Sequence, residues 1–160
     1  MPRIARLIAG LSLLLPALAF AQASPVGHWR SIDDATGKPK AVIEIADAGN
    51  GTLSARIVRI LDLKDGPNPL CDHCKGQRHD RPMVGMVIAW GLKAGDGAWE
   101  GGRIIDPENG KEYAVKMTPV DGGRRLEVRG FLGIALLGRT QVWQRECPPA
   151  GGGAAAGGVR

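Results

Sequence analysis

The central part of the chain alternates apolar and polar residues with a period of two. Tyr113, Val115 and Met117 are each separated by one residue, and Leu126 and Val128 alternate with charged residues. Successive side chains of a β-strand point to opposite faces of a sheet, so this alternation predicts half-buried strands. No helical pattern of useful length interrupts them.

Turn signals separate the apolar runs at short intervals. They are "DDATGK", "DAGNG", "AGDG", "DPENG" and "DGG", in which Gly and Asn suit the positive-φ positions of tight turns. The pattern predicts eight strands, at about 26–32, 40–47, 52–61, 84–92, 98–105, 111–119, 124–131 and 137–146. Strands of this kind must protect their edges, and closing the sheet removes the edges altogether. We therefore expect an all-β fold, an eight-stranded antiparallel up-and-down barrel, with a β-sandwich as the competing architecture.

The two ends of the chain differ from this domain in composition. Residues 1–23 carry two arginines, an apolar run over 7–20 and small-x-small cleavage patterns, which is typical of a secretory signal peptide. The apolar run is too short to span a membrane, so we expect a soluble bacterial protein that is periplasmic or secreted. Residues 147–160 are rich in Gly and Ala and predict a flexible tail, which leaves a single domain over 24–146.

The charge of the chain does not indicate a nucleic-acid partner. Without the two signal-peptide arginines the chain has 19 basic and 16 acidic residues, a net charge of +3. The basic residues are scattered, whereas a nucleic-acid surface requires a basic patch with interleaved aromatic side chains. Export from the cytoplasm argues against such a partner as well.

One aromatic residue and one basic residue indicate how the sheet closes. Trp29 lies on the first predicted strand and Arg145 at the end of the last, and these strands are antiparallel neighbours if the barrel closes. The two side chains would then meet, and a guanidinium over an indole ring is a favourable cation–π contact. A Gly-x-Trp on the first strand with an Arg on the last resembles the closing contact of the calycins, the superfamily of lipocalins and avidins.

Four longer stretches resemble one family. They are "SPVGHWRSIDDATGKPKAVIEI", "CDHCKGQRHDRPMVGMVI", "WEGGRIIDPENGKEYAVKM" and "LEVRGFLGIALLGRTQVWQR". They are similar to the bacterial secreted proteins grouped as domain of unknown function 2147, over essentially all of residues 24–146. The resemblance implies a lipocalin-like barrel in the periplasm, and it implies no established activity and no catalytic residues. The Cys-x-x-Cys at 71 and 74 fits its pattern, whereas Cys147 and the Gly/Ala tail are additions to it.

Two cysteines and two histidines fall in the long connection over about 62–83, in "CDHCKGQRHD". A Cys71–Cys74 disulfide suits an oxidising compartment and would shape the loop more than stabilise the fold. The alternatives are a zinc site that includes His73 or His79, a thiol–disulfide exchange centre, and a bridge from Cys147 to either cysteine. We favour the local disulfide and expect neither a metal nor a cofactor, because the sequence offers no second ligand pair and no helix after Cys74.

Two stretches are apolar on both strand faces, "MVIAWGL" at 86–92 and "GFLGIALLG" at 130–138. One face fits a barrel interior, and the other must cover a barrel end, a ligand entrance, the long loop or a second subunit. Trp90, Trp99 and Phe131 are the candidate ligand-binding residues, since aromatic side chains in a barrel suit an apolar ligand.

The sequence contains no catalytic constellation, so we expect a binding protein for a small or lipid-like molecule rather than an enzyme. The first alternative is a structural or adaptor protein of the envelope that docks a partner through residues 130–138, and a homodimer could use the same surface. The second is a thiol- or metal-dependent enzyme that uses the loop over 71–80.

Overall fold

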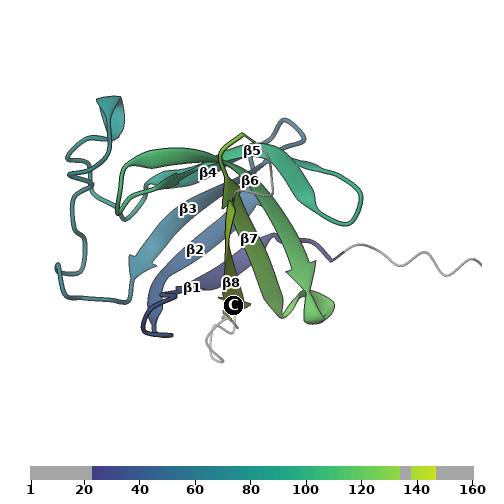
Figure 1. The fold of residues 1–160 in the computed structure, drawn as a ribbon, viewed down its shortest axis with the longest axis horizontal. Coiled ribbons are helices and arrows are strands. Elements are labelled where there is room, and N and C mark those ends of the chain that lie inside the picture. Colours follow the sequence, from purple (N-terminus) through teal and green to yellow (C-terminus); the bar gives the residue numbers. More distant parts are fainter. Residues whose placement is uncertain (1–22, 134–137, 147–160) are drawn as a thin grey trace, which may run out of the picture.

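The strands of the protein close into a single barrel. The computed structural model describes residues 23–133 and 138–146. The eight strands are β1 (Gly27–Ile32), β2 (Pro39–Asp47), β3 (Leu53–Ile60), β4 (Val87–Ala94), β5 (Trp99–Asp106), β6 (Lys111–Val120), β7 (Arg125–Phe131) and β8 (Gly138–Arg145). Each strand pairs antiparallel with the next in the chain, and β8 pairs back onto β1 (Figure 1). The predicted up-and-down barrel is therefore confirmed, and the β-sandwich is wrong.

The observed strand bounds agree with the predicted ones to within one residue, β4 excepted. We expected that strand to begin at 84, but it begins at Val87. Residues 83–86 form a turn instead, because Gly85 has a φ of 90° and the amide of Met86 donates to the carbonyl of Met83 at 3.1 Å. Met83, Val84 and Met86 are apolar, so hydrophobicity alone does not distinguish this turn from the strand that follows.

One half of the barrel is packed with large apolar side chains. Trp29, Ile45, Leu92, Met117 and Leu126 are all essentially buried. Each of them lies near the end of its strand that faces the β2–β3, β4–β5 and β6–β7 connections. Full burial of such a side chain contributes roughly 1.5–3 kcal/mol, so this packed end is a main source of stability.

The seam between β1 and β8 is short and is reinforced by side chains. Trp29 pairs with Arg145 across it, and the guanidinium of Arg145 lies 4.2 Å from the centroid of the Trp29 ring. Arg145 also donates hydrogen bonds to backbone carbonyls on the incoming chain and on the β6–β7 connection. Gly27 has a φ of 127°, and a Cβ there would come within 2.8 Å of the guanidinium, so the Gly of Gly-x-Trp is required by both conformation and space.

The long connection between β3 and β4 folds back onto the barrel. Cys71 and Cys74 form a disulfide with their Cα atoms 5.3 Å apart, and both belong to the same buried apolar cluster as Ile88. Ile88 and its neighbour Ala89 are both buried, although adjacent strand residues point to opposite faces. We conclude that the β3–β4 connection covers the outer face of β4. This explains why β4 carries apolar side chains on both of its faces.

Several expectations concern residues outside the described ranges. They are the signal peptide up to residue 22, the tail over 147–160 with Cys147, and residues 134–137 of the apolar run at 130–138. Within the described ranges, no helix is long and apolar enough to cross a membrane.

Candidate functional site

A cavity opens at the end of the barrel opposite the packed half. Its volume is about 1250 Å³, which exceeds the roughly 300–1,000 Å³ of ordinary small-molecule pockets. The β1–β2, β3–β4, β5–β6 and β7–β8 connections gather at its mouth, because every second connection of an up-and-down sheet lies at the same end. The apolar wall includes Ile43, Ile57, Ile60, Ile104, Val128 and Trp143.

The polar groups of Ser31 and Trp143 in the cavity wall are already hydrogen-bonded within the protein. The hydroxyl of Ser31 donates to the carbonyl of Ala41 at 3.4 Å, and the indole N–H of Trp143 donates to the Gln141 side chain at 3.3 Å. No buried side-chain nitrogen or oxygen in the described part of the chain lacks a partner. The wall therefore offers a ligand apolar contact and few unused hydrogen-bonding groups, which suits a molecule with a large apolar part.

Two basic side chains at the mouth are each held by carboxylates. Lys40 pairs with Glu108 and, at 3.7 Å, with Asp33. Arg139 donates from Nε to Asp34 at 2.6 Å. This hydrogen bond is the main reason that the pKa of Arg139 is raised, and nearby negative charges act in the same direction. The Lys40–Glu108 and Arg139–Asp34 pairs each join the first residues of a strand to a connection that is distant in sequence, so they help to fix the shape of the entrance.

Asp33 also organises the β1–β2 connection. Its carboxylate accepts hydrogen bonds from the hydroxyl and the amide of Thr36, at 2.7 and 2.8 Å. These hydrogen bonds, the hydroxyl first, lower the pKa of Asp33, and the charge of Lys40 adds to the effect. Asp33 therefore stays ionised at neutral pH and can hold Lys40 at the mouth.

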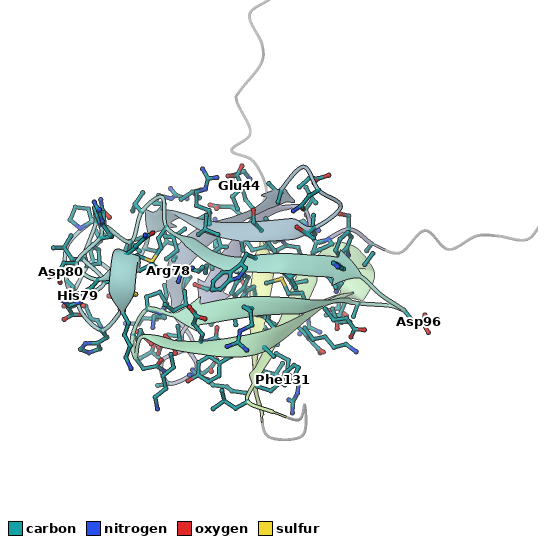
Figure 2. All side chains as sticks on the ribbon, turned by 90° about the horizontal axis from the view of Figure 1, so that it is seen from above. Glu44, Arg78, His79, Asp80, Asp96 and Phe131 are labelled. Carbon is teal, nitrogen blue, oxygen red and sulfur yellow. A yellow bond between two sulfur atoms is a disulfide. The ribbon has the colours of Figure 1, made fainter. Side chains whose placement is uncertain are left out.

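The three aromatic residues selected from the sequence lie in different places. Phe131 ends β7 and lines the mouth of the cavity. Trp90 is outside the cavity lining. Arg78, which the long connection carries (Figure 2), places its guanidinium 4.6 Å from the centroid of the Trp90 ring. Trp99 begins β5 at the packed end, where it pairs with Met117. A binding role for any of the three stays a prediction, and of the three only Phe131 lines this cavity.

Sequence reasoning missed the aromatic residue that lines the cavity wall. Trp143 lies two residues before Arg145 on β8, it is buried, and it borders the cavity. Ile43 and Ile57 on β2 and β3 share that wall. Such residues could be found by counting along each strand from the connection at the mouth. Every second side chain faces the barrel interior, and those nearest the mouth line the cavity.

A family model covers residues 27–145, which is nearly the whole barrel. The chain belongs to the bacterial family DUF2147. That family is described as uncharacterized proteins conserved in bacteria, so the resemblance noted in the motifs is confirmed. The search of curated proteins found no match.

A solved structure shares the fold. It is described as "Protein HP1028 from the human pathogen Helicobacter pylori belongs to the lipocalin family". It is 20% identical to this chain, with a TM-score of 0.68 over 78% of this chain and 84% of that chain. This likeness shows that the chain folds as a lipocalin-like barrel, and it identifies no ligand.

The disulfide loop of this DUF2147 protein carries two exposed histidine–aspartate pairs. The Nδ1 atom of His73 lies 3.4 Å from Oδ1 of Asp72, and the Nε2 atom of His79 lies 3.3 Å from Oδ2 of Asp80. His79 also approaches the carbonyl of Cys74 at 3.1 Å. Among the described residues, no three His, Cys, Asp or Glu side chains come together as a metal site would require. With Cys71 and Cys74 bonded to each other, their sulfurs serve to shape the loop.

Proposed function

We propose that this protein is an exported bacterial binding protein that holds a small molecule with a large apolar part inside its barrel. The observation that carries the proposal is the cavity of about 1250 Å³, open at one end and apolar along its wall. A wall of this kind binds by excluding water from apolar surface, at about 25 cal/mol per Å² buried. Binding rather than catalysis is favoured because, among the described residues that line the cavity, no nucleophile lies next to a base.

A neutral probe that fluoresces in apolar surroundings, N-phenyl-1-naphthylamine, tests this proposal. We expect the wild-type protein to bind it with saturation at one site. Gly130→Phe should weaken binding at least tenfold, because a Cβ at Gly130 makes only ordinary contacts with Tyr113 and Ile104, and a larger side chain then extends into the cavity they line. Val142→Phe is the matched control, since Val142 is 38% exposed and does not line the cavity.

The outcome is decisive when both variants unfold at the same urea concentration as the wild type to within experimental error. If the wild type fails to bind the probe, or if Gly130→Phe binds it as tightly as Val142→Phe, the cavity is not a binding site. Ala41→Phe, at a second lining position in β2, repeats the test should Gly130→Phe fold poorly.

We propose further that residues 1–23 direct export and are removed. Sequencing the N-terminus of the protein recovered from the periplasm tests this, with Ser24 expected near the start. A titration of free thiols on the same material should give one reactive thiol per chain, from Cys147, because Cys71 and Cys74 are bonded to each other. Three reactive thiols would favour the thiol- or metal-dependent alternative.

A second candidate function is docking of a partner at the cavity mouth. Leu63, Leu70 and Leu132 are 60%, 51% and 57% exposed and lie in the connections around the mouth. Exposed leucines of this kind mark contact surfaces when they cluster. A photo-reactive amino acid at Leu132 tests the candidate: a specific crosslinked protein in the envelope supports docking, and crosslinks no different from those of the same group at Val142 argue against it.

A further inference from the structure

We propose that the ligand is an amphiphile with a cationic head group, whose apolar part enters the barrel and whose charge stays at the mouth. This inference rests on the proposed binding function and names the class of molecule that the same cavity selects. It follows from the way in which charge is distributed over the cavity: a neutral interior, two of three basic side chains already paired, and a surplus of carboxylates at the mouth.

The interior provides nothing that could compensate a charge. Its lining side chains, such as Ile43, Ile57, Val128 and Trp143, are apolar, and the hydroxyl of Ser31 is engaged with the backbone. Burying an unpaired charge there would cost a great deal of free energy. A charged head group therefore has to remain at the mouth, and the charges at the mouth decide which sign is accepted.

The basic side chains at the mouth are poorly placed to serve an anionic head group. Lys40 is engaged by Asp33 and Glu108, and Arg139 by Asp34. An anion would have to displace these carboxylates, which are tethered to the same protein and already in place. The third basic lining residue, Lys64, is exposed on the long connection and has no carboxylate partner among the described residues. The entrance thus lacks the built cationic site that binding of a carboxylate or phosphate would need.

Acidic residues outnumber basic ones along the lining. Six acidic residues stand against three basic ones, namely Asp62, Asp65, Asp72, Asp80, Asp106 and Glu108 against Lys40, Lys64 and Arg139. This surplus is local, since the complete chain has a net charge of +5.

Three of the six carboxylates lack a direct ion pair in the described part of the chain, although Asp106 lies close enough to Arg139 to help raise its pKa. Asp62, Asp65 and Asp106 form no ion pair with any described residue. Asp62 accepts a backbone hydrogen bond, which leaves its charge uncompensated. Asp106 accepts backbone and amide hydrogen bonds and also acts on the more distant charge of Arg139. A cleft edged by one sign of charge and walled by apolar groups focuses the field on its entrance and concentrates the opposite charge there.

Displacement of the naphthylamine probe by amphiphiles of one chain length tests the inference. Decyltrimethylammonium, decyl maltoside and decanoate share a ten-carbon chain, and each is used below the concentration at which it forms micelles. At neutral pH and about 10 mM salt, where charges act over about 30 Å, we expect the cation to bind at least about fivefold more tightly than decanoate. At about 150 mM salt the ratio should shrink, since screening then acts within about 8 Å.

Substitutions at the mouth locate the effect. Asp62→Asn combined with Asp65→Asn removes two of the uncompensated charges, and we expect the preference for the cation to fall by at least half. The matched control combines Glu44→Gln and Asp96→Asn; Asp96 lies at the opposite end of the molecule from His79 and Asp80 (Figure 2). This control changes the net charge equally and should leave the preference unchanged.

The results separate this inference from the proposed function. If decanoate binds as tightly as the cation at low salt, or if the mouth and control variants change the preference equally, the cationic assignment is overturned while binding itself stands. If the protein binds neither the probe nor any of the three amphiphiles, the binding function fails and the assignment fails with it.

Discussion

Replacing Arg145 with Met should destabilise the barrel through its seam. The guanidinium lies 4.2 Å from the centroid of the Trp29 ring and donates to the carbonyls of Ser24 and Val26 at 3.0 Å and to that of Gly123. A hydrogen bond from a charged donor contributes about 1.5–3 kcal/mol and a cation–π contact about 0.5–2 kcal/mol. These contributions do not add fully, because some of the carbonyls regain water. We expect the free energy of unfolding to fall by about 2–4 kcal/mol.

Urea unfolding followed by tryptophan fluorescence and far-ultraviolet circular dichroism measures this loss. The matched control is Arg59→Met, which removes an arginine of the same size whose ion pair with Glu146, at 2.8 Å, involves a side chain that is 59% exposed. An exposed pair contributes only about 0–1 kcal/mol. A loss below about 1 kcal/mol for Arg145→Met, or one equal to that of Arg59→Met at unchanged m-value, would refute the importance of the seam contact.

Two further predictions concern the long connection. Gly110→Ala should cost clearly more stability than Gly97→Ala: both glycines have positive φ, but only at Gly110 would a Cβ collide with the chain, at the carbonyl of His73. If the two variants lose the same free energy in urea, the close approach has no energetic importance. Replacing Cys71 and Cys74 by Ala together should cost about 2 kcal/mol or less, because the closed loop is short, while amide exchange over 69–85 accelerates; unchanged exchange would show that the disulfide does not hold the loop.

Local pattern was sufficient to predict the barrel. The alternation of Tyr113, Val115 and Met117 identifies a strand without knowledge of its neighbours, because the period of two follows from backbone geometry. Trp29 and Arg145 add the closing contact, since an antiparallel seam brings the start of the first strand to the end of the last. Only at β4 do the observed bounds differ from the predicted ones by more than one residue, because Gly85 makes a turn just before the apolar run at 86–92.

The residues that line the cavity were harder to predict, because residue type does not say which end of the barrel a side chain faces. Trp99 begins its strand and so lies far from the mouth, whereas Phe131 ends its strand and lies at it. Strand order alone would have separated Trp99 from Phe131, because β5 and β7 both run from the packed end to the mouth. The surroundings of Trp90 could not be found in this way, because Arg78 reaches it from a connection whose path no local pattern encodes.

Both ends of the described chain meet beside the seam. The amide of Glu146 donates to the carbonyl of His28 at 2.9 Å, and Arg145 reaches back to Ser24. A fusion partner or a surface linker joined to residue 23 or residue 146 would therefore be attached at the packed end of the barrel, away from the cavity mouth. If the proposed binding function holds, a protein immobilised through residue 146 should keep its affinity for ligands that reach the cavity mouth from solution.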